Sequence, residues 1–123
     1  AEPPGPRELA VRVRAVSLNY RDLAIARGAY GSYALPLVPG SDAAGEVVAA
    51  GPGVTRFAVG DRVCLGYVPD WIDGPVRADV ARRRLGGPID GVLREQVVAH
   101  EDALVRAPDH LDLLEASSFP SPA

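Results

Sequence analysis

Residues 36–48 read PLVPGSDAAGEVV, and two more turn-bearing stretches follow closely, GPGV at 51–54 and VGDRV at 59–63. In these stretches, turns that contain glycine alternate with short β-branched runs, a pattern typical of strands joined by tight turns. The segment therefore predicts a compact barrel in which the turns hold a small acidic pocket.

The rest of the chain repeats this alternation of short elements. Apolar and charged residues alternate between Leu9 and Leu18, which is the period of a half-buried strand. Further strands are expected at 45–50, 62–66, 92–99 and 103–105, and short helices at 20–27, 76–85 and 111–118. Six or so short strands with three short helices predict a mainly β fold, a partly open barrel with short helices at its edges.

The first of these helices carries its own end signals. Asn19 can cap its N-terminus, and Asp22 falls at the third helical position, where a carboxylate can reach back to free backbone N–H groups. Leu23, Ile25 and Ala26 offer an apolar face, and Gly28 can close the helix in the left-handed conformation.

Size and composition indicate one soluble domain at most. The chain has 123 residues, of which 47% are apolar and 24% charged, and no window holds the roughly 18 apolar residues that a membrane span needs. Cys64 is the single cysteine, which suits a reducing cytoplasm. Because it lies between Val63 and Leu65, we expect a buried, inert thiol. The prediction is a cytoplasmic protein with no membrane partner.

The charge distribution argues against nucleic-acid binding. The formal net charge is −3, and every basic residue is arginine. The one basic cluster, Arg82 to Arg84, has no interleaved aromatic residues, whereas phosphate binding needs a broader basic face. We interpret the cluster as a solvated helix face and expect no nucleic-acid partner.

Five motifs, in order along the chain, resemble the catalytic domain of the medium-chain dehydrogenases/reductases, the alcohol dehydrogenase superfamily. They are VRVRAVSLNYRDL at 11–23, PGSDAAGEV at 39–47, GDRV at 60–63, GVLRE at 91–95 and VRAPDHL at 105–111. The resemblance covers nearly the whole chain and implies a GroES-like barrel that precedes, and partly packs on, a Rossmann domain. Residues 1–123 are then expected to be the GroES-like catalytic domain alone, a fragment that lacks the Rossmann domain.

Zinc-dependent members of this superfamily carry a Cys where Asn19 stands and a His-Glu pair where Ser41 and Asp42 stand. Zinc needs about three protein ligands, usually Cys and His, and leaves a fourth position open for substrate. An amide and a hydroxyl are poor replacements, so only Asp42 remains a good ligand. His100 and His110 lie outside the motifs and are expected to be exposed or locally hydrogen-bonded. The prediction is therefore no zinc, and the chain resembles the zinc-independent, quinone oxidoreductase-like branch.

This resemblance implies roles for five residues. Asn19 would lie beside the nicotinamide and donate a hydrogen bond to a substrate oxygen, although a role as a helix cap alone has equal weight. Tyr30 would border the active cleft as a donor or packing group, with simple loop packing as the alternative. Tyr20 would line the cleft or the interdomain seam and contact the cofactor. Ser41 and Asp42 would lie in the substrate pocket, more as a hydrogen-bonded structural pair than as catalytic groups.

The implied cofactor is NADP or NAD, but no G-x-G-x-x-G fingerprint occurs in the chain. Gly51-Pro52-Gly53 leads toward a strand instead of a helix, so we reject it as a phosphate loop. The cofactor is expected to bind mainly to the missing domain. The function implied is an NAD(P)H-dependent oxidoreductase that transfers hydride to or from a carbonyl, quinone or conjugated enone, and the isolated chain is expected to be inactive.

A second hypothesis is a non-catalytic GroES-like module that acts in oligomer or partner binding. Such modules need a long mobile loop, and Tyr67 to Gly91 is the single segment of suitable length. Its mixed charges and Trp71 favour instead a lobe over the cleft or a dimer surface, so a homodimer is compatible with the sequence. We also expect an exposed apolar seam where the Rossmann domain would pack.

Overall fold

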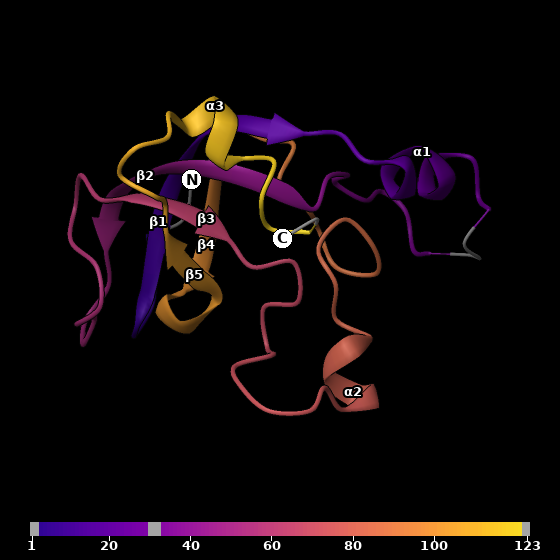
Figure 1. Ribbon diagram of the computed structural model, residues 1–123. Coiled ribbons are helices and arrows are strands. Elements are labelled where there is room, and N and C mark those ends of the chain that lie inside the picture. The colour runs from indigo at the N-terminus through magenta and orange to yellow at the C-terminus, as the bar shows by residue number, and fades with distance from the viewer. Residues whose placement is uncertain (1–2, 30–32, 122–123) are drawn as a thin grey trace.

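The computed structural model describes residues 3–29 and 33–121. They form a single antiparallel sheet of five strands in the spatial order β4-β1-β2-β3-β5, which curls around the core as a partly open barrel (Figure 1). The strands are β1 (Glu8–Ser17), β2 (Asp42–Ala50), β3 (Arg62–Leu65), β4 (Gln96–His100) and β5 (Leu104–Arg106). The expected mainly β, partly open barrel is confirmed.

The register between β1 and β2 positions the candidate site. The pairing runs from Leu9 opposite Ala50 to Ser17 opposite Asp42. Position 45 requires glycine in this pairing, because a Cβ there would lie 2.2 Å from the Arg12 carbonyl oxygen. Because Ser17, the last residue of β1, pairs with Asp42, the first residue of β2, Asn19 lies close to Asp42.

The hydrophobic core fills the concave side of this sheet. Its buried members come from every strand and from the connecting segments, and include Leu9, Val11, Val47, Phe57, Val63, Leu85, Val92, Val97 and Leu104. A smaller cluster packs the last helix against the sheet and contains Cys64. Burial raises the pKa of the Cys64 thiol, and its Sγ lies 3.5 Å from the Ala116 carbonyl oxygen, so the expected buried thiol is confirmed.

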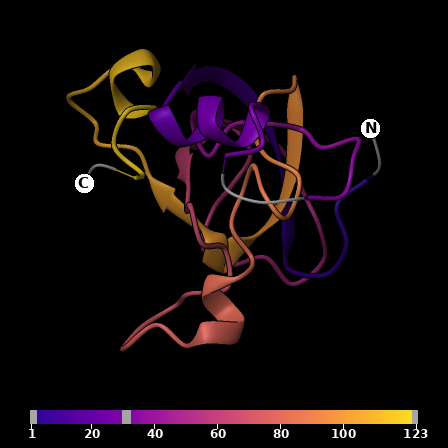
Figure 2. The same cartoon turned by 90° about the vertical axis from the view of Figure 1, so that its right-hand side faces the viewer.

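Three short α-helices lie at the edges of the sheet: α1 (Tyr20–Ala26), α2 (Ala78–Ala81) and α3 (Leu113–Ala116), with a 3-10 turn, η1 (Glu101–Ala103), before β5. Figure 2 shows α1 near the viewer and α2 below it, at the end of a protruding lobe. None of the helices in the described part of the chain has the length and apolar character that a bilayer span requires.

Some elements differ from the sequence-based expectation. Strand β4 begins at Gln96 instead of Val92, because residues 91–93 donate their N–H groups to the loop carbonyls of 38–40. Helix α2 ends at Ala81 instead of Leu85, since the buried Leu85 donates its N–H to the Tyr67 carbonyl. Arg82 and Arg83 are solvated as expected, but they follow the helix.

The apolar face expected on α1 was also partly wrong. Ala24 and Asp22 are buried on this helix, whereas Leu23 is 46% exposed. The end signals were right: the Asn19 N–H donates to Asp22 Oδ2 at 2.8 Å, and Gly28 has a φ of 75°. A helix of seven residues makes only about two turns, so the pattern of apolar residues did not identify its buried face.

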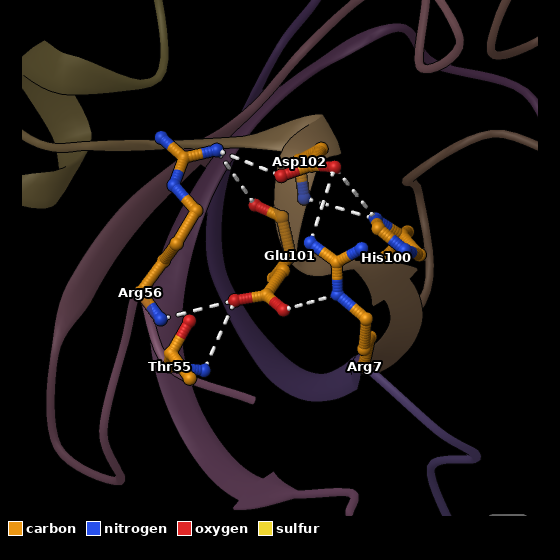
Figure 3. A network of polar contacts seen from close by, with 6 residues as sticks. All are labelled: Arg7, Thr55, Arg56, His100, Glu101 and Asp102. Carbon is orange, nitrogen blue, oxygen red and sulfur yellow. Dashed lines mark hydrogen bonds and ion pairs between the residues drawn. The ribbon is translucent and has the colours of Figure 1, made fainter. Parts of the chain in front are cut away.

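A buried acidic residue joins three segments at the opposite end of the barrel (Figure 3). Glu101 is fully buried; its Oε2 accepts from Arg7 Nε at 2.8 Å. Its Oε1 accepts from the backbone N–H groups of Thr55 and Arg56 at 3.1 and 3.0 Å. These hydrogen bonds lower the pKa of Glu101 to about 2. The bond from Arg7 has the largest effect, and the bond from the Thr55 N–H has the next largest. This cluster fixes the N-terminal segment to the 54–56 turn.

Candidate functional site

The candidate site begins where β1 passes into α1. Asn19 has extended backbone angles, φ −117° and ψ 161°, so its backbone caps the helix while its side chain turns toward the sheet. The side-chain amide Nδ2 donates to Asp42 Oδ2 at 2.9 Å. Asn19 therefore caps the helix with its backbone and contacts Asp42 with its side chain, so the capping role does not occupy the side-chain amide.

Asp42 is the buried acceptor of this site. It is fully buried at the start of β2, and a carboxylate removed from water must be given donors. Besides the Asn19 amide, it accepts a hydrogen bond at Oδ1 from the Ser121 hydroxyl at 2.6 Å. Both oxygens thus have partners from distant parts of the chain, and the amide of Asn19 is held in one orientation.

Ser41 and Tyr20 flank this pair differently. Ser41 is buried, with 1% of its surface exposed, and the donors to Asp42 come from Asn19 and Ser121 instead of from Ser41. Tyr20, the first residue of α1, follows Asn19 directly in the chain, and 78% of its surface is exposed. Tyr30 lies outside the described residues. The structure therefore brings Asn19 and Asp42 into contact, with Ser41 and Tyr20 next to them in the chain.

Sequence reasoning missed Ser121. It lies 79 positions from Asp42, after α3, in a Ser-Pro-rich stretch that gives no local signal of a partner. Helix α3 carries it to the site, because the helix packs on β1 and β2 and the Ser17 and Ser117 hydroxyl oxygens lie 3.2 Å apart. Only the three-dimensional position of α3 could identify this donor.

The histidines and acidic residues form no further centre. His100 is locally hydrogen-bonded, since its Nδ1 accepts from the Asp102 N–H at 3.1 Å, and His110 is exposed; both expectations are confirmed. Within residues 3–29 and 33–121, no three His, Cys, Asp or Glu side chains are grouped as a metal would require.

Comparison with known proteins is decisive at this point. The family model for the alcohol dehydrogenase GroES-like domain matches residues 5–109. The chain belongs to this family. The sequence-based resemblance is therefore confirmed over most of the domain.

Two relatives that match nearly the whole chain carry oxidoreductase names. A zinc-type alcohol dehydrogenase-like protein of Schizosaccharomyces pombe is 39% identical over 119 residues, which are 96% of this chain and 34% of the relative. A quinone oxidoreductase of Pseudomonas aeruginosa is 39% identical over 115 residues, 94% of this chain and 29% of the relative. The chain thus spans about a third of the length of these relatives.

The fold of the GroES-like domain recurs in solved structures. The crystal structure of an NAD-dependent alcohol dehydrogenase aligns with this chain with a TM-score of 0.78 and 34% identity. The alignment covers 97% of this chain and 37% of the dehydrogenase. The curled sheet described above is therefore the architecture of the family.

Proposed function

We propose that this chain is the substrate domain of a zinc-independent NAD(P)H-dependent oxidoreductase, which transfers hydride to or from a carbonyl, quinone or conjugated enone. Membership of the GroES-like family and the names of its relatives support an oxidoreductase. The complete protein would add a Rossmann domain as the main cofactor site. The chain spans only about a third of the length of these relatives, which leaves room for such a domain.

The observation that carries the proposal is the Asn19–Asp42 pair. A primary amide has two N–H donors, and the buried Asp42 accepts one of them at 2.9 Å. Among residues 3–29 and 33–121 the amide donates to no other acceptor, so its second N–H would be available for a substrate oxygen, in a direction set by the bond to Asp42. A preorganised neutral donor of this kind stabilises negative charge that develops on oxygen during hydride transfer.

The other predicted residues take supporting parts in this proposal. The nicotinamide, when bound, supplies or receives the hydride. The exposed ring of Tyr20 and the amide of Asn19 would contact the cofactor and orient it. Ser41 and Asp42 would form the floor of the substrate pocket, with Asp42 as the positioning residue for Asn19. Tyr30 stays a predicted donor or packing group at the rim.

A catalytic zinc does not fit the residues at this site. Asn19 offers an amide whose N–H points at Asp42, and both Asp42 oxygens already accept hydrogen bonds from protein donors. Ser41 contributes a neutral hydroxyl, while zinc sites use thiolate, imidazole and carboxylate ligands. We therefore propose that activation of the substrate oxygen proceeds through hydrogen bonds, even though one relative is named as zinc-type.

The test uses the complete protein that contains this domain. NADPH and NADH oxidation is followed with a quinone, an enone and an aldehyde as acceptors. We expect turnover with at least one acceptor, and Asn19→Ala should lower kcat about 100-fold, the usual effect of losing one such donor. Asp109→Asn, a change of an exposed residue away from the site, is the matched control. Full activity of the Asn19 variant, or activity of the isolated 123-residue chain, would contradict the proposal.

A further inference from the structure

Two buried side-chain atoms in the described part of the chain have no hydrogen-bond partner, Asp22 Oδ1 and Arg84 Nε. Buried polar atoms are nearly always satisfied, so each exception requires an explanation such as local strain, a functional role, or a bound water or ion. Both atoms belong to residues that line surface pockets, and Tyr33 lies in the wall of both pockets. The Arg84 pocket is the one that offers an unused donor.

This pocket is rich in positive charge and hydrogen-bond donors. It has a volume of about 290 Å³ and is lined by Arg21, Tyr33, Tyr67 and Arg84. No acidic side chain is among these lining residues. Figures 1 and 2 both show the segment after α2, which carries Arg84, rising toward α1, which carries Arg21. Two arginines that are far apart in the sequence, Arg21 and Arg84, therefore line the same pocket.

The protein holds Arg21 rigidly without neutralising it. Its Nη1 donates to the Leu85 carbonyl at 3.0 Å, and its Nη2 donates to the Gly87 carbonyl. Its guanidinium lies 5.1 Å from the centre of the Tyr67 ring. Carbonyl oxygens and an aromatic face carry no net charge, so the full positive charge of Arg21 persists at the pocket wall.

Six of the thirteen arginines of this chain have a carboxylate oxygen within 4 Å: Arg7, Arg14, Arg56, Arg77, Arg83 and Arg106. Neither Arg21 nor Arg84 has such a partner among residues 3–29 and 33–121. Arg21 and Arg84 line the same pocket, and like charges repel, so an anion bound there would offset their repulsion.

We propose that this pocket binds a small oxyanion, the carboxylate or phosphate group of a small molecule. The Arg84 Nε–H donates to one oxygen, the Tyr33 and Tyr67 phenols supply O–H donors, and the fixed charge of Arg21 adds attraction. Planar guanidinium groups suit carboxylate and phosphate oxygens, and such charge-assisted bonds are about twice as strong as neutral ones. The site stands independently of hydride transfer, because none of its four residues is placed in the proposed chemistry.

The 123-residue chain labelled with ¹⁵N allows a direct test, in which the Arg Nε–Hε resonances are followed by NMR. Sodium phosphate and sodium acetate are titrated separately at pH 7, with sodium chloride at matched ionic strength as the reference. We expect the Arg84 resonance to move saturably with at least one oxyanion and not with chloride. The arm that saturates tells a phosphate-bearing ligand from a carboxylate-bearing one.

Two variants give the site its control. Arg84→Gln should weaken oxyanion binding at least about tenfold, the loss expected for one charge-assisted hydrogen bond. Arg82→Gln removes the same charge two residues away, outside the pocket, and should leave binding unchanged. If Arg84→Gln does not fold, Tyr67→Phe provides the second variant and should weaken binding as well. Equal movement with chloride, or binding unchanged in the Arg84 and Tyr67 variants, would overturn the proposal.

Discussion

Asp42 is the residue on which the geometry of the candidate site depends. The strand register brings it opposite Ser17, and its carboxylate receives donors from Asn19 and Ser121. The position at which related zinc enzymes are expected to hold a metal ligand is here occupied by an internal acceptor. In the proposed function, this carboxylate supports a neutral donor in place of binding a metal.

Replacement of Asp42 separates this positioning role from simple packing. Asp42→Ala leaves the half-buried Asn19 amide and the exposed Ser121 hydroxyl without their acceptor and should lower the free energy of unfolding by about 1–3 kcal/mol. Asp42→Asn keeps the size of the side chain, so it should cost less stability. It should still lower kcat about tenfold or more with KM little changed, because the Asn19 amide can rotate. Steady-state kinetics of the complete protein and urea unfolding are the measurements.

Ser121→Ala is the companion change, since it removes one donor to Asp42 and leaves the Asn19 bond intact. We expect a smaller loss of kcat than for Asp42→Asn. A larger effect of Ser121→Ala than of Asp42→Asn would show that Asp42 does not act through Asn19.

Glu101 gives the fold an acid-sensitive contact. Its pKa is lowered from 4.5 to about 2, so the unfolded chain binds more protons than the folded one between these values. The stabilising contribution of Glu101 is therefore complete above the unfolded pKa and is lost as the pH falls toward the folded pKa. Thermal unfolding between pH 2 and 5 should show a steeper loss of Tm in the wild type than in Glu101→Gln.

Glu95→Gln is the control for this titration, because Glu95 is exposed. Its profile should follow the wild type throughout the acid range. Identical slopes for the wild type and Glu101→Gln would exclude a depressed pKa at Glu101.

At the scale of elements, strands with clear alternation were predictable and their interruptions were not. The period-two pattern located β1 to within one residue at each end. Val92 and Leu93 are apolar enough to begin a strand, but the N–H groups of residues 91–93 donate to the loop carbonyls at 38–40, a long-range pairing that leaves no mark in the sequence. Tertiary contact also ended α2 early, through the Leu85–Tyr67 bond.

The same contrast applies to the site. Asn19 and Asp42 stand out by their motif positions, whereas Ser121 has no sequence signal for its contact with Asp42, and the basic cluster at 82–84 does not distinguish Arg84 from its exposed neighbours. Their importance arises from the packing of α3 and of the segment after α2. Sequence reasoning therefore located the residues on the long paired strands and missed those carried in by short connections.

The loop that follows α2 is locked to the 39–40 turn by glycine contacts. A Cβ at Gly91 would lie 2.0 Å from the Gly40 carbonyl oxygen, and one at Gly86 would lie 2.9 Å from the same atom. Gly91→Ala should therefore force the two segments apart and cost about 3 kcal/mol or more of unfolding free energy.

Gly28→Ala is the comparison for this element. Its φ is 75° and a Cβ there would meet nothing within 4 Å, so the expected cost is only about 1 kcal/mol, that of the left-handed conformation. Chemical unfolding of both variants decides the matter. A cost for Gly91→Ala no larger than that for Gly28→Ala would contradict the close contact.

At the scale of the whole molecule, apolar side chains are exposed at the end that bears the candidate site. Leu18 is 75% exposed, Tyr20 78% and Leu114 73%. Of these residues, Tyr20 is the one that the sequence-based prediction places at the cleft or the interdomain seam. Large exposed apolar surfaces favour association with a partner or with other copies.

We predict that the isolated chain self-associates through this surface. The double change Leu18→Ser and Leu114→Ser should shift it toward monomer in light scattering, with little change of Tm, because neither side chain is buried. Val59→Ser, at a turn where the side chain is 63% exposed, should leave association as it is. If Val59→Ser shifted the chain toward monomer as much as the double change does, self-association would not proceed through the surface of Leu18 and Leu114.

The central claim is that neutral donors, with Asn19 foremost, take the place of a metal at this site. Elemental analysis of the complete protein, purified without chelator and equilibrated with excess Zn²⁺ before gel filtration, tests it most directly. We predict far less than one zinc per chain attributable to this domain, with the same content in Asp42→Asn. One tightly held zinc per chain, located between Asn19 and Asp42 by anomalous scattering and lost in Asp42→Asn, would contradict the account.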